Sequence, residues 1–111
     1  MARSNEPIWW SLFSAGGVVA AFFIPMTLLV TGIAVPAGWI SAEGLRELVQ
    51  HPLTRIYLFV LIAFPLFHWA HRFRFAAVDL GLRAYGGVLA VVCYGAAIAG
   101  TLLAVVFLVR L

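Results

Sequence analysis

Hydrophobic positions in this chain gather into three long stretches that short charged segments separate. The first runs from residue 7 to residue 42 and holds 36 positions without a formal charge, and the third, residues 84–109, holds 26. Roughly 20 apolar residues in a helix cross the ~30 Å hydrocarbon core of a bilayer. Both stretches are therefore long enough for a membrane-spanning helix, and the pattern predicts an all-α integral membrane protein.

The second stretch, residues 56–70, is short for a span because Arg55 and Arg72 bound it. Pro52 extends it, since proline is well tolerated in the first turn of a helix. A helix from residue 52 to residue 73 is about 33 Å long at about 1.5 Å per residue. Arg55 then reaches the membrane interface with its long side chain.

The segment 41–50 is different, because its apolar and charged residues take opposite faces of a helix. Leu45, Leu48 and Val49 recur at helical spacing, opposite two glutamates and an arginine. A short amphipathic helix of this kind lies at the membrane interface rather than across it. The predicted organisation is one membrane-anchor domain, residues 1–111, with spans at about 8–38, 52–73 and 83–110 and an interfacial segment at 41–50.

Composition supports this assignment and excludes other classes. Hydrophobic residues make up 65% of the chain and charged residues 10%, whereas about a quarter of the residues in soluble domains are charged. The formal charge of +3 comes from arginines that flank the spans, so no nucleic-acid partner is expected. The first stretch exceeds the ~7–15 apolar residues of a cleaved signal peptide, so it is expected to remain as a span.

The arginines also predict how three spans are oriented. The N-terminus and the second loop share one membrane face with four arginines, and the first loop and the C-terminus share the other with three. Because positive residues favour the cytoplasmic side, the N-terminus is expected to be cytoplasmic in a multi-pass protein of the cell inner membrane. The two groups are Arg3, Arg72, Arg74 and Arg83 on the first face and Arg46, Arg55 and Arg110 on the second. Small residues in the spans predict packing against a partner subunit.

Polar side chains at the end of the second span form the candidate site. His68 and His71 are three positions apart and share a helix face, and Arg72 follows them. The start of the first span lies on the same membrane face. The residues expected to approach the histidines from there are Trp9, Trp10, Phe13 and Ser14. No catalytic residue and no metal-ligating cluster is predicted.

Two interpretations of this cluster are open. One is an interfacial anchor with a stop-transfer charge, because arginine and aromatic residues are enriched at membrane interfaces. The other is a quinone site, in which the ring stacks on an aromatic side chain and donors hold its carbonyl oxygens. A histidine there is also able to exchange protons with the ring.

The N-terminal segment reads Ser4-Asn-Glu-Pro-Ile-Trp-Trp-Ser-Leu-Phe-Ser-Ala-Gly-Gly17. It resembles the N-terminal signature of the smaller hydrophobic membrane anchor, the D subunit, of bacterial quinol:fumarate reductase. In that signature an Asp-Glu-Pro segment leads into Trp-Gly-Leu-Phe-Gly-Ala-Gly-Gly. The resemblance continues through Pro25, Pro36 and residues 65–80, and so covers nearly the whole chain in layout.

The resemblance implies a three-span anchor that, with a second membrane anchor, the C subunit, holds the flavoprotein and iron–sulfur subunits to the membrane. Fumarate is then reduced on a soluble partner, and this chain contributes to menaquinol binding and oxidation. The implied quinone-site residues are Trp10, Phe13, Ser14, His71 and Arg72. Ser14 replaces the glycine of the family, which narrows the pocket or adds a hydrogen bond. Menaquinone is the expected cofactor, and no haem is expected.

Two other function classes fit parts of the pattern. The haem-bearing anchor of succinate dehydrogenase places a haem b between its small subunits, and His68, a turn deeper than His71, is the candidate ligand. A small multispan transporter is the other class. Proton-coupled transporters generally need a carboxylate within a span, and here the four acidic residues lie outside the expected spans. These residues are Glu6, Glu43, Glu47 and Asp79.

Overall fold

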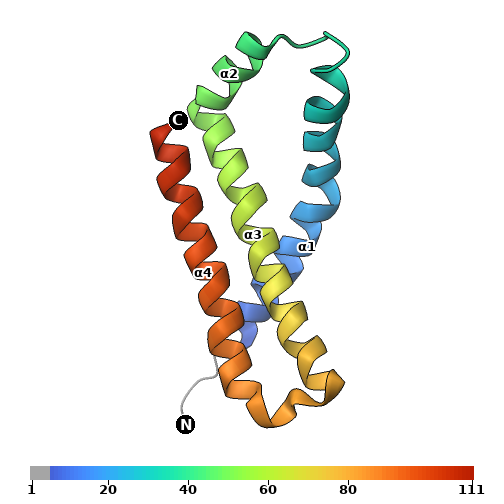
Figure 1. The fold of residues 1–111 in the computed structure, drawn as a ribbon, viewed down its shortest axis with the longest axis vertical. Coiled ribbons are helices and arrows are strands. Elements are labelled where there is room, and N and C mark those ends of the chain that lie inside the picture. The colour runs from blue at the N-terminus through green and yellow to red at the C-terminus, as the bar shows by residue number, and fades with distance from the viewer. Residues whose placement is uncertain (1–5) are drawn as a thin grey trace.

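The computed structural model describes residues 6–111, which fold into helices joined by short turns (Figure 1). The helices are α1 (Glu6–Leu29), α2 (Ala42–Gln50), α3 (Pro52–Ala77) and α4 (Gly86–Arg110). A π-helical turn, Val30–Ala34, extends α1. The prediction of an all-helical chain is confirmed for these residues, while Arg3, Ser4 and Asn5 lie outside them.

α3 is the central helix and packs against both α1 and α4. α4 runs back along α3 in the opposite direction, and α1 crosses α3 toward the end of the molecule where the N-terminus lies (Figure 1). At the crossing, Gly16 of α1 faces the backbone of Phe64 and the side chain of His68. A Cβ atom on Gly16 would lie 2.7 Å from the Cβ of His68 and 2.9 Å from the carbonyl carbon of Phe64. The glycine therefore permits this close approach.

Small residues also let α3 and α4 approach closely. Ala70 of α3 and Ala97 of α4 are both 0% exposed, and Cys93 and Tyr94 are buried beside them. Alanine at a helix interface brings the two backbones near each other without leaving space between them. Gly16, Ala70 and Ala97 thus serve contacts within the chain itself. By contrast, a Cβ atom at Gly86, Gly87 or Gly95 would meet, beyond its chain neighbours and the adjacent backbone of its own helix, nothing of the described chain within 4 Å. Packing of small residues against a partner subunit stays a prediction.

The chain reverses between α3 and α4 through a π-helical turn, Val78–Leu82, and a 3-10 turn, Arg83–Tyr85. Gly81 has φ = 108°, a left-handed conformation that glycine adopts without the steric penalty of a side chain. Asp79 is exposed and makes no ion pair within residues 6–111. The reversal therefore depends on the glycine and not on a salt bridge of Asp79.

Side-chain caps position α2 and the start of α3. The Ser41 hydroxyl accepts a hydrogen bond from the Gly44 amide at 3.0 Å, and His51 Nδ1 accepts one from the Leu53 amide at 3.1 Å. Pro52 occupies the first turn of α3, as the sequence pattern predicted. The apolar face of α2 turns toward α1 and α3, where Leu45 and other apolar residues line a cavity of about 490 Å³.

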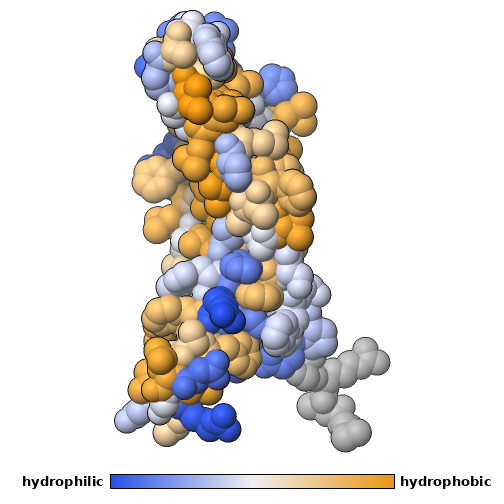
Figure 2. All heavy atoms as spheres, turned by 90° about the vertical axis from the view of Figure 1, so that its right-hand side faces the viewer, coloured by the Kyte–Doolittle hydropathy of each residue, from blue (hydrophilic) through white to orange (hydrophobic). Residues whose placement is uncertain are grey.

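Within residues 6–111, two helical segments are long and apolar enough to cross a membrane, Glu6–Ala34 and Pro52–Arg110. The second folds back on itself at Gly81 into α3 and α4. Large apolar side chains such as Phe22, Leu102 and Phe107 are more than half exposed. Hydrophobic residues dominate the face in Figure 2, where hydrophilic residues gather at the upper end and in the lower half. So much exposed apolar surface needs a lipid or protein environment.

Candidate functional site

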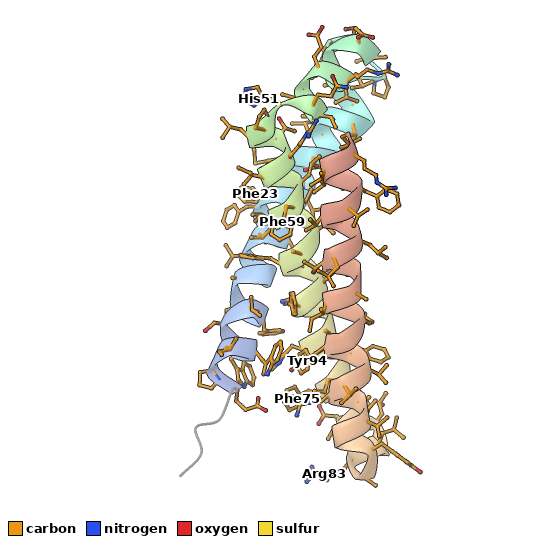
Figure 3. All side chains as sticks on the ribbon, turned by 90° about the vertical axis from the view of Figure 1, so that its left-hand side faces the viewer. Phe23, His51, Phe59, Phe75, Arg83 and Tyr94 are labelled. Carbon is orange, nitrogen blue, oxygen red and sulfur yellow. The ribbon has the colours of Figure 1, made fainter. Side chains whose placement is uncertain are left out.

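Three helix segments meet at one end of the molecule: the first turns of α1, the last turns of α3 and the first turns of α4 (Figure 1). Figure 3 shows Tyr94 and Phe75 toward this end, where Arg83 also lies, and His51 at the opposite end. Helix direction alone therefore brings together residues that are far apart in the sequence. Most of the aromatic contacts of the chain occur here.

His71 is the centre of this cluster and is 2% exposed. Its ring lies 4.5 Å from the Trp10 ring and 5.0 Å from the Phe13 ring, measured between centroids, and 4.8 Å from the ring of Phe75. Trp10 and Phe75 meet the imidazole edge to face, a favourable arrangement for aromatic pairs. We call these three side chains, Trp10, Phe13 and Phe75, the aromatic box.

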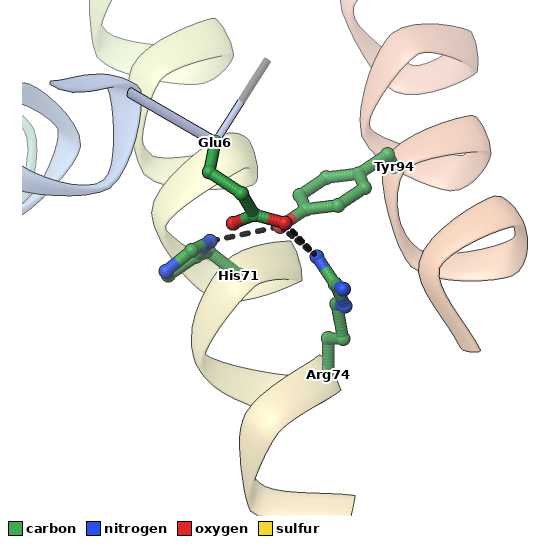
Figure 4. A network of polar contacts seen from close by, with 4 residues as sticks. All are labelled: Glu6, His71, Arg74 and Tyr94. Carbon is green, nitrogen blue, oxygen red and sulfur yellow. Dashed lines mark hydrogen bonds and ion pairs between the residues drawn. The ribbon is translucent and has the colours of Figure 1, made fainter. Parts of the chain in front are cut away.

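Two hydrogen bonds and an ion pair connect His71 to the surface (Figure 4). His71 Nδ1 lies 2.8 Å from the hydroxyl of Tyr94, and Arg74 Nη1 donates to the same hydroxyl at 3.2 Å. Arg74 in turn pairs with the Glu6 carboxylate at 3.6 Å, and the Glu6 side chain is 42% exposed. This network of Glu6, Arg74, Tyr94 and His71 joins all three long helices.

The other ring nitrogen of His71, Nε2, is also buried, but it has no hydrogen-bond partner among residues 6–111. A buried polar atom of this kind costs roughly 1–3 kcal/mol when it stays unpaired. Because no group of the described chain pairs with it, a ligand or a neighbouring subunit is left to satisfy it. Nε2 is therefore the clearest indication of a binding site.

Tyr94 is held in place by packing as well as by hydrogen bonds. Tyr94 is 7% exposed, and its ring stacks on Trp9 at 4.2 Å between centroids, with an interplanar angle of 15°. Beside it, Glu6, Trp9, Arg74 and Tyr94 line an open groove of about 400 Å³ whose remaining lining residues belong to α4. The groove gives the polar network access to the surface between α1 and α4.

His68 lies one turn deeper and has different contacts. Its Nδ1 is 2.8 Å from the carbonyl oxygen of Phe13, so Nδ1 carries the hydrogen that this bond requires. The imidazole stacks on the Phe13 ring at 4.4 Å with an interplanar angle of 7°. His68 thus ties α3 to α1, and its Nε2 carries no proton in the neutral form.

The structure brings together three of the five residues implied by the family resemblance, Trp10, Phe13 and His71. Ser14 and Arg72 are exposed on their helices and make no hydrogen bond or ion pair within the described part of the chain. Trp9, which was expected near the histidines, stacks on Tyr94 instead. No three histidine, cysteine or acidic residues between residues 6 and 111 are close enough to hold a metal ion.

The residues that sequence reasoning missed are Glu6, Arg74, Phe75 and Tyr94. Two signals in the sequence could have found them. The first was Arg74, which lies three positions after His71 and so shares its helix face, whereas Arg72 does not. The second was Tyr94, a tyrosine inside an otherwise apolar stretch, since a buried hydroxyl needs a partner. A flat ring with polar oxygens suits this combination of aromatic walls and a few fixed polar groups.

Comparison with known proteins finds a family that matches nearly the whole chain. A family model that describes the D subunit of fumarate reductase matches residues 1–109. The chain is 45% identical over 104 residues to the fumarate reductase D subunit of Mycobacterium tuberculosis (strain ATCC 25618 / H37Rv), covering 89% of this chain and 82% of the relative. It is 42% identical over 111 residues to the fumarate reductase D subunit of Aliivibrio fischeri (strain MJ11), covering 96% and 92%.

Proposed function

This chain belongs to the family of fumarate reductase D subunits, and on that premise we propose that it anchors a fumarate reductase complex in the cell inner membrane and contributes to its menaquinol site. The proposed partners are the flavoprotein subunit, the iron–sulfur subunit and a second membrane anchor, the C subunit. Fumarate is reduced on the soluble subunits. This chain holds them at the membrane and helps to bind the electron donor.

The proposed topology has three spans, formed by α1, α3 and α4. These helices contain 24, 26 and 25 residues, so each is about 36–39 Å long at 1.5 Å per residue and exceeds the ~30 Å hydrocarbon core. Arg72, Arg74 and Arg83 lie at the end where α1 begins, which favours a cytoplasmic N-terminus. α2 then lies at the opposite interface, with its apolar face toward the bundle.

The observation that carries the proposed quinol site is the buried Nε2 of His71, which lacks a partner among the described residues and lies beside the aromatic box. A quinone offers a flat ring for Trp10 and Phe13 and an oxygen for His71. When bound, menaquinol supplies the electrons for fumarate reduction and releases its protons. Ser14 and Arg72, exposed near the same helix ends, are proposed to face the remainder of the site on the partner anchor.

The test separates quinol oxidation from fumarate reduction. His71→Ala and Arg72→Leu are each expected to lower menaquinol-driven fumarate reduction by at least about tenfold, the effect of losing one hydrogen bond to a charged or well-placed partner. Fumarate reduction with an artificial electron donor should stay largely intact, because that reaction bypasses the anchor. Both rates are measured on the same purified complex.

Two matched variants control for general damage. His51→Asn keeps a side-chain cap at the opposite end of α3, and Arg83→Leu removes an exposed arginine at the same end as Arg72. Both should keep normal menaquinol oxidation. Equal loss of both activities in the His71 and Arg72 variants would indicate failed assembly, and full menaquinol activity in both variants would contradict the proposed site.

A haem-bearing anchor of the succinate dehydrogenase type is the second candidate, and one observation favours it. His68 donates from Nδ1 to the Phe13 carbonyl, the arrangement by which many metal-bound histidines orient Nε2 toward the metal. We nevertheless propose a haem-free complex, because His68 stacks on Phe13 and already has a role in joining α1 to α3. A b-type absorption band that disappears in His68→Ala would establish the alternative.

A further inference from the structure

The hydrogen bonds around Tyr94 bear on which nitrogen of His71 carries the proton. Arg74 can only donate, so its Nη1–H occupies a lone pair of the Tyr94 hydroxyl oxygen. The hydroxyl has one hydrogen of its own, and His71 Nδ1 lies 2.8 Å away within reach of it. When the Tyr94 hydroxyl accepts a hydrogen bond from Arg74 and donates its own hydrogen to His71 Nδ1, each of the two contacts joins a donor to an acceptor.

Arg74 is itself fixed in this donating position. It pairs with Glu6 at 3.6 Å on one side, and its guanidinium carbon lies 4.8 Å from the centroid of the Phe75 ring on the other. Positive charge over an aromatic face is favourable. The Tyr94 ring is fixed by its stacking on Trp9. Packing and charge therefore hold both partners of the Tyr94 hydroxyl in place.

We propose that Tyr94 is a positioning residue, which keeps neutral His71 as the tautomer with its hydrogen on Nε2 and so presents a hydrogen-bond donor beside the aromatic box. Because Nδ1 accepts from Tyr94, the imidazole hydrogen lies on Nε2. Nε2 is the buried atom that has no partner within residues 6–111. The chain therefore holds a preformed N–H group that awaits an acceptor.

This inference rests on the proposed menaquinol site and specifies the form of the ligand that the site favours. A carbonyl oxygen accepts a hydrogen bond, so the Nε2–H group suits the oxidised quinone. In this tautomer His71 holds the carbonyl oxygen of the quinone product and is not the first acceptor of a quinol proton. The accepting group for that proton then belongs to another part of the site.

The first test is a ¹⁵N solid-state NMR spectrum of the complex, with ¹⁵N-labelled histidine, reconstituted in lipid bilayers. Protonated and unprotonated ring nitrogens have well-separated shifts, and the His71 signals are those that vanish in His71→Gln. The expected wild-type pattern is a protonated Nε2 and an unprotonated Nδ1. A protonated Nδ1 in the wild-type spectrum would overturn the proposal, whether or not any variant assembles.

The second test measures the affinity of the complex for oxidised menaquinone. Tyr94→Phe should produce a mixture of His71 tautomers and weaken quinone binding by about tenfold, as for the loss of one oriented hydrogen bond. Tyr57→Phe is the matched control, because Tyr57 also makes hydrogen bonds, to Thr27 and Phe23, at the other end of the molecule. Its quinone affinity should equal that of the wild type.

The outcomes distinguish this inference from the proposed function. Unchanged tautomers and unchanged quinone affinity in Tyr94→Phe would refute the positioning role, even if His71→Ala abolishes menaquinol oxidation. A third outcome is a protonated Nε2 in the wild type together with wild-type quinone affinity in both His71→Ala and Tyr94→Phe. The tautomer assignment then stands and the proposed menaquinol site fails.

Discussion

Replacing Gly16 with alanine tests the crossing of α1 and α3, on which the candidate site depends. The new Cβ atom would lie 2.7 Å from His68 Cβ and 2.9 Å from the carbonyl carbon of Phe64, with the Phe64 carbonyl oxygen closer still. Carbon atoms in contact prefer about 3.5–4.0 Å. Neither neighbour is the flexible end of a side chain, so α1 has to move away from α3 by about 1 Å.

The cost of this movement has several parts. Overpacking at a tight contact costs about 1–3 kcal/mol. The same shift lengthens the 2.8 Å hydrogen bond between His68 Nδ1 and the Phe13 carbonyl, which adds about 1 kcal/mol. Alanine is the better helix former and offsets about 1 kcal/mol. We expect a net loss of about 1–3 kcal/mol in stability.

The assay measures two quantities for each variant. One is the unfolding temperature of the detergent-solubilised complex, monitored by size-exclusion chromatography, and the other is the yield of complex purified from membranes. Gly87→Ala and Gly95→Ala are matched controls in α4, because a Cβ atom at either position meets, beyond its chain neighbours and the adjacent backbone of its own helix, no atom of the described chain within 4 Å. The two controls should unfold at the wild-type temperature or slightly above it. Gly16→Ala should unfold earlier and assemble in lower yield.

If Gly16→Ala matched the two α4 controls in yield and unfolding temperature, the close contact of α1 with α3 at Gly16 would be wrong. The positions of Trp10 and Phe13 beside His71 would then lose their basis, because α1 carries both aromatic residues to the site. Gly17→Ala is an informative intermediate, since its Cβ atom would meet only the His68 ring, at 3.1 Å.

Three further variants test other contacts. Tyr57→Phe removes a hydroxyl that bonds Thr27 at 2.7 Å and the Phe23 carbonyl at 3.1 Å, and should lower thermal stability by about 1 kcal/mol without slowing menaquinol oxidation; slower oxidation would couple the two ends of the molecule. Ser41→Ala should remove the cap of α2 at a cost of about 1 kcal/mol, seen as faster amide hydrogen exchange over residues 42–45, and Ser41→Asn should restore protection. Glu6→Gln should change stability by less than about 1 kcal/mol, because the Arg74–Glu6 pair is partly exposed; a larger loss in thermal unfolding would mean that the pair is desolvated in the complex.

Length and apolarity were sufficient to predict that the long helices exist, but not all of their bounds. The first span was expected to reach residue 38, whereas the helix ends with the π-helical turn at Ala34, and the third was expected from residue 83, whereas α4 begins at Gly86. α3 begins at Pro52 and continues beyond residue 73, where the run of aromatic and basic residues was expected to lie at the interface. The proximity of Trp10 and Phe13 to His71 also followed, since consecutive helices that run in opposite directions bring the start of the first to the end of the second. These predictions needed only the direction of each helix and its periodicity.

The rotation of α4 about its axis was not predictable in the same way. Its apolar residues surround the whole helix, so no amphipathic stripe indicates which side faces α3. Tyr94 contacts His71 only because Ala70, Cys93 and Ala97 fix that rotation by close packing. The pairing of Arg74 with Glu6 depends instead on how α1 packs against α3. Contacts across helices thus required the structure, whereas contacts along one helix did not.

The central claim is that this chain anchors a haem-free fumarate reductase complex, and a visible difference spectrum tests it most directly. The tagged chain is purified in mild detergent, and the reduced-minus-oxidised spectrum of everything that co-purifies with it is recorded. We expect a broad bleach from flavin and iron–sulfur centres without sharp bands. A sharp b-type band would move the assignment to the haem-bearing anchors and make His68 the first residue to mutate, and a colourless eluate would contradict the anchor function and favour a transporter.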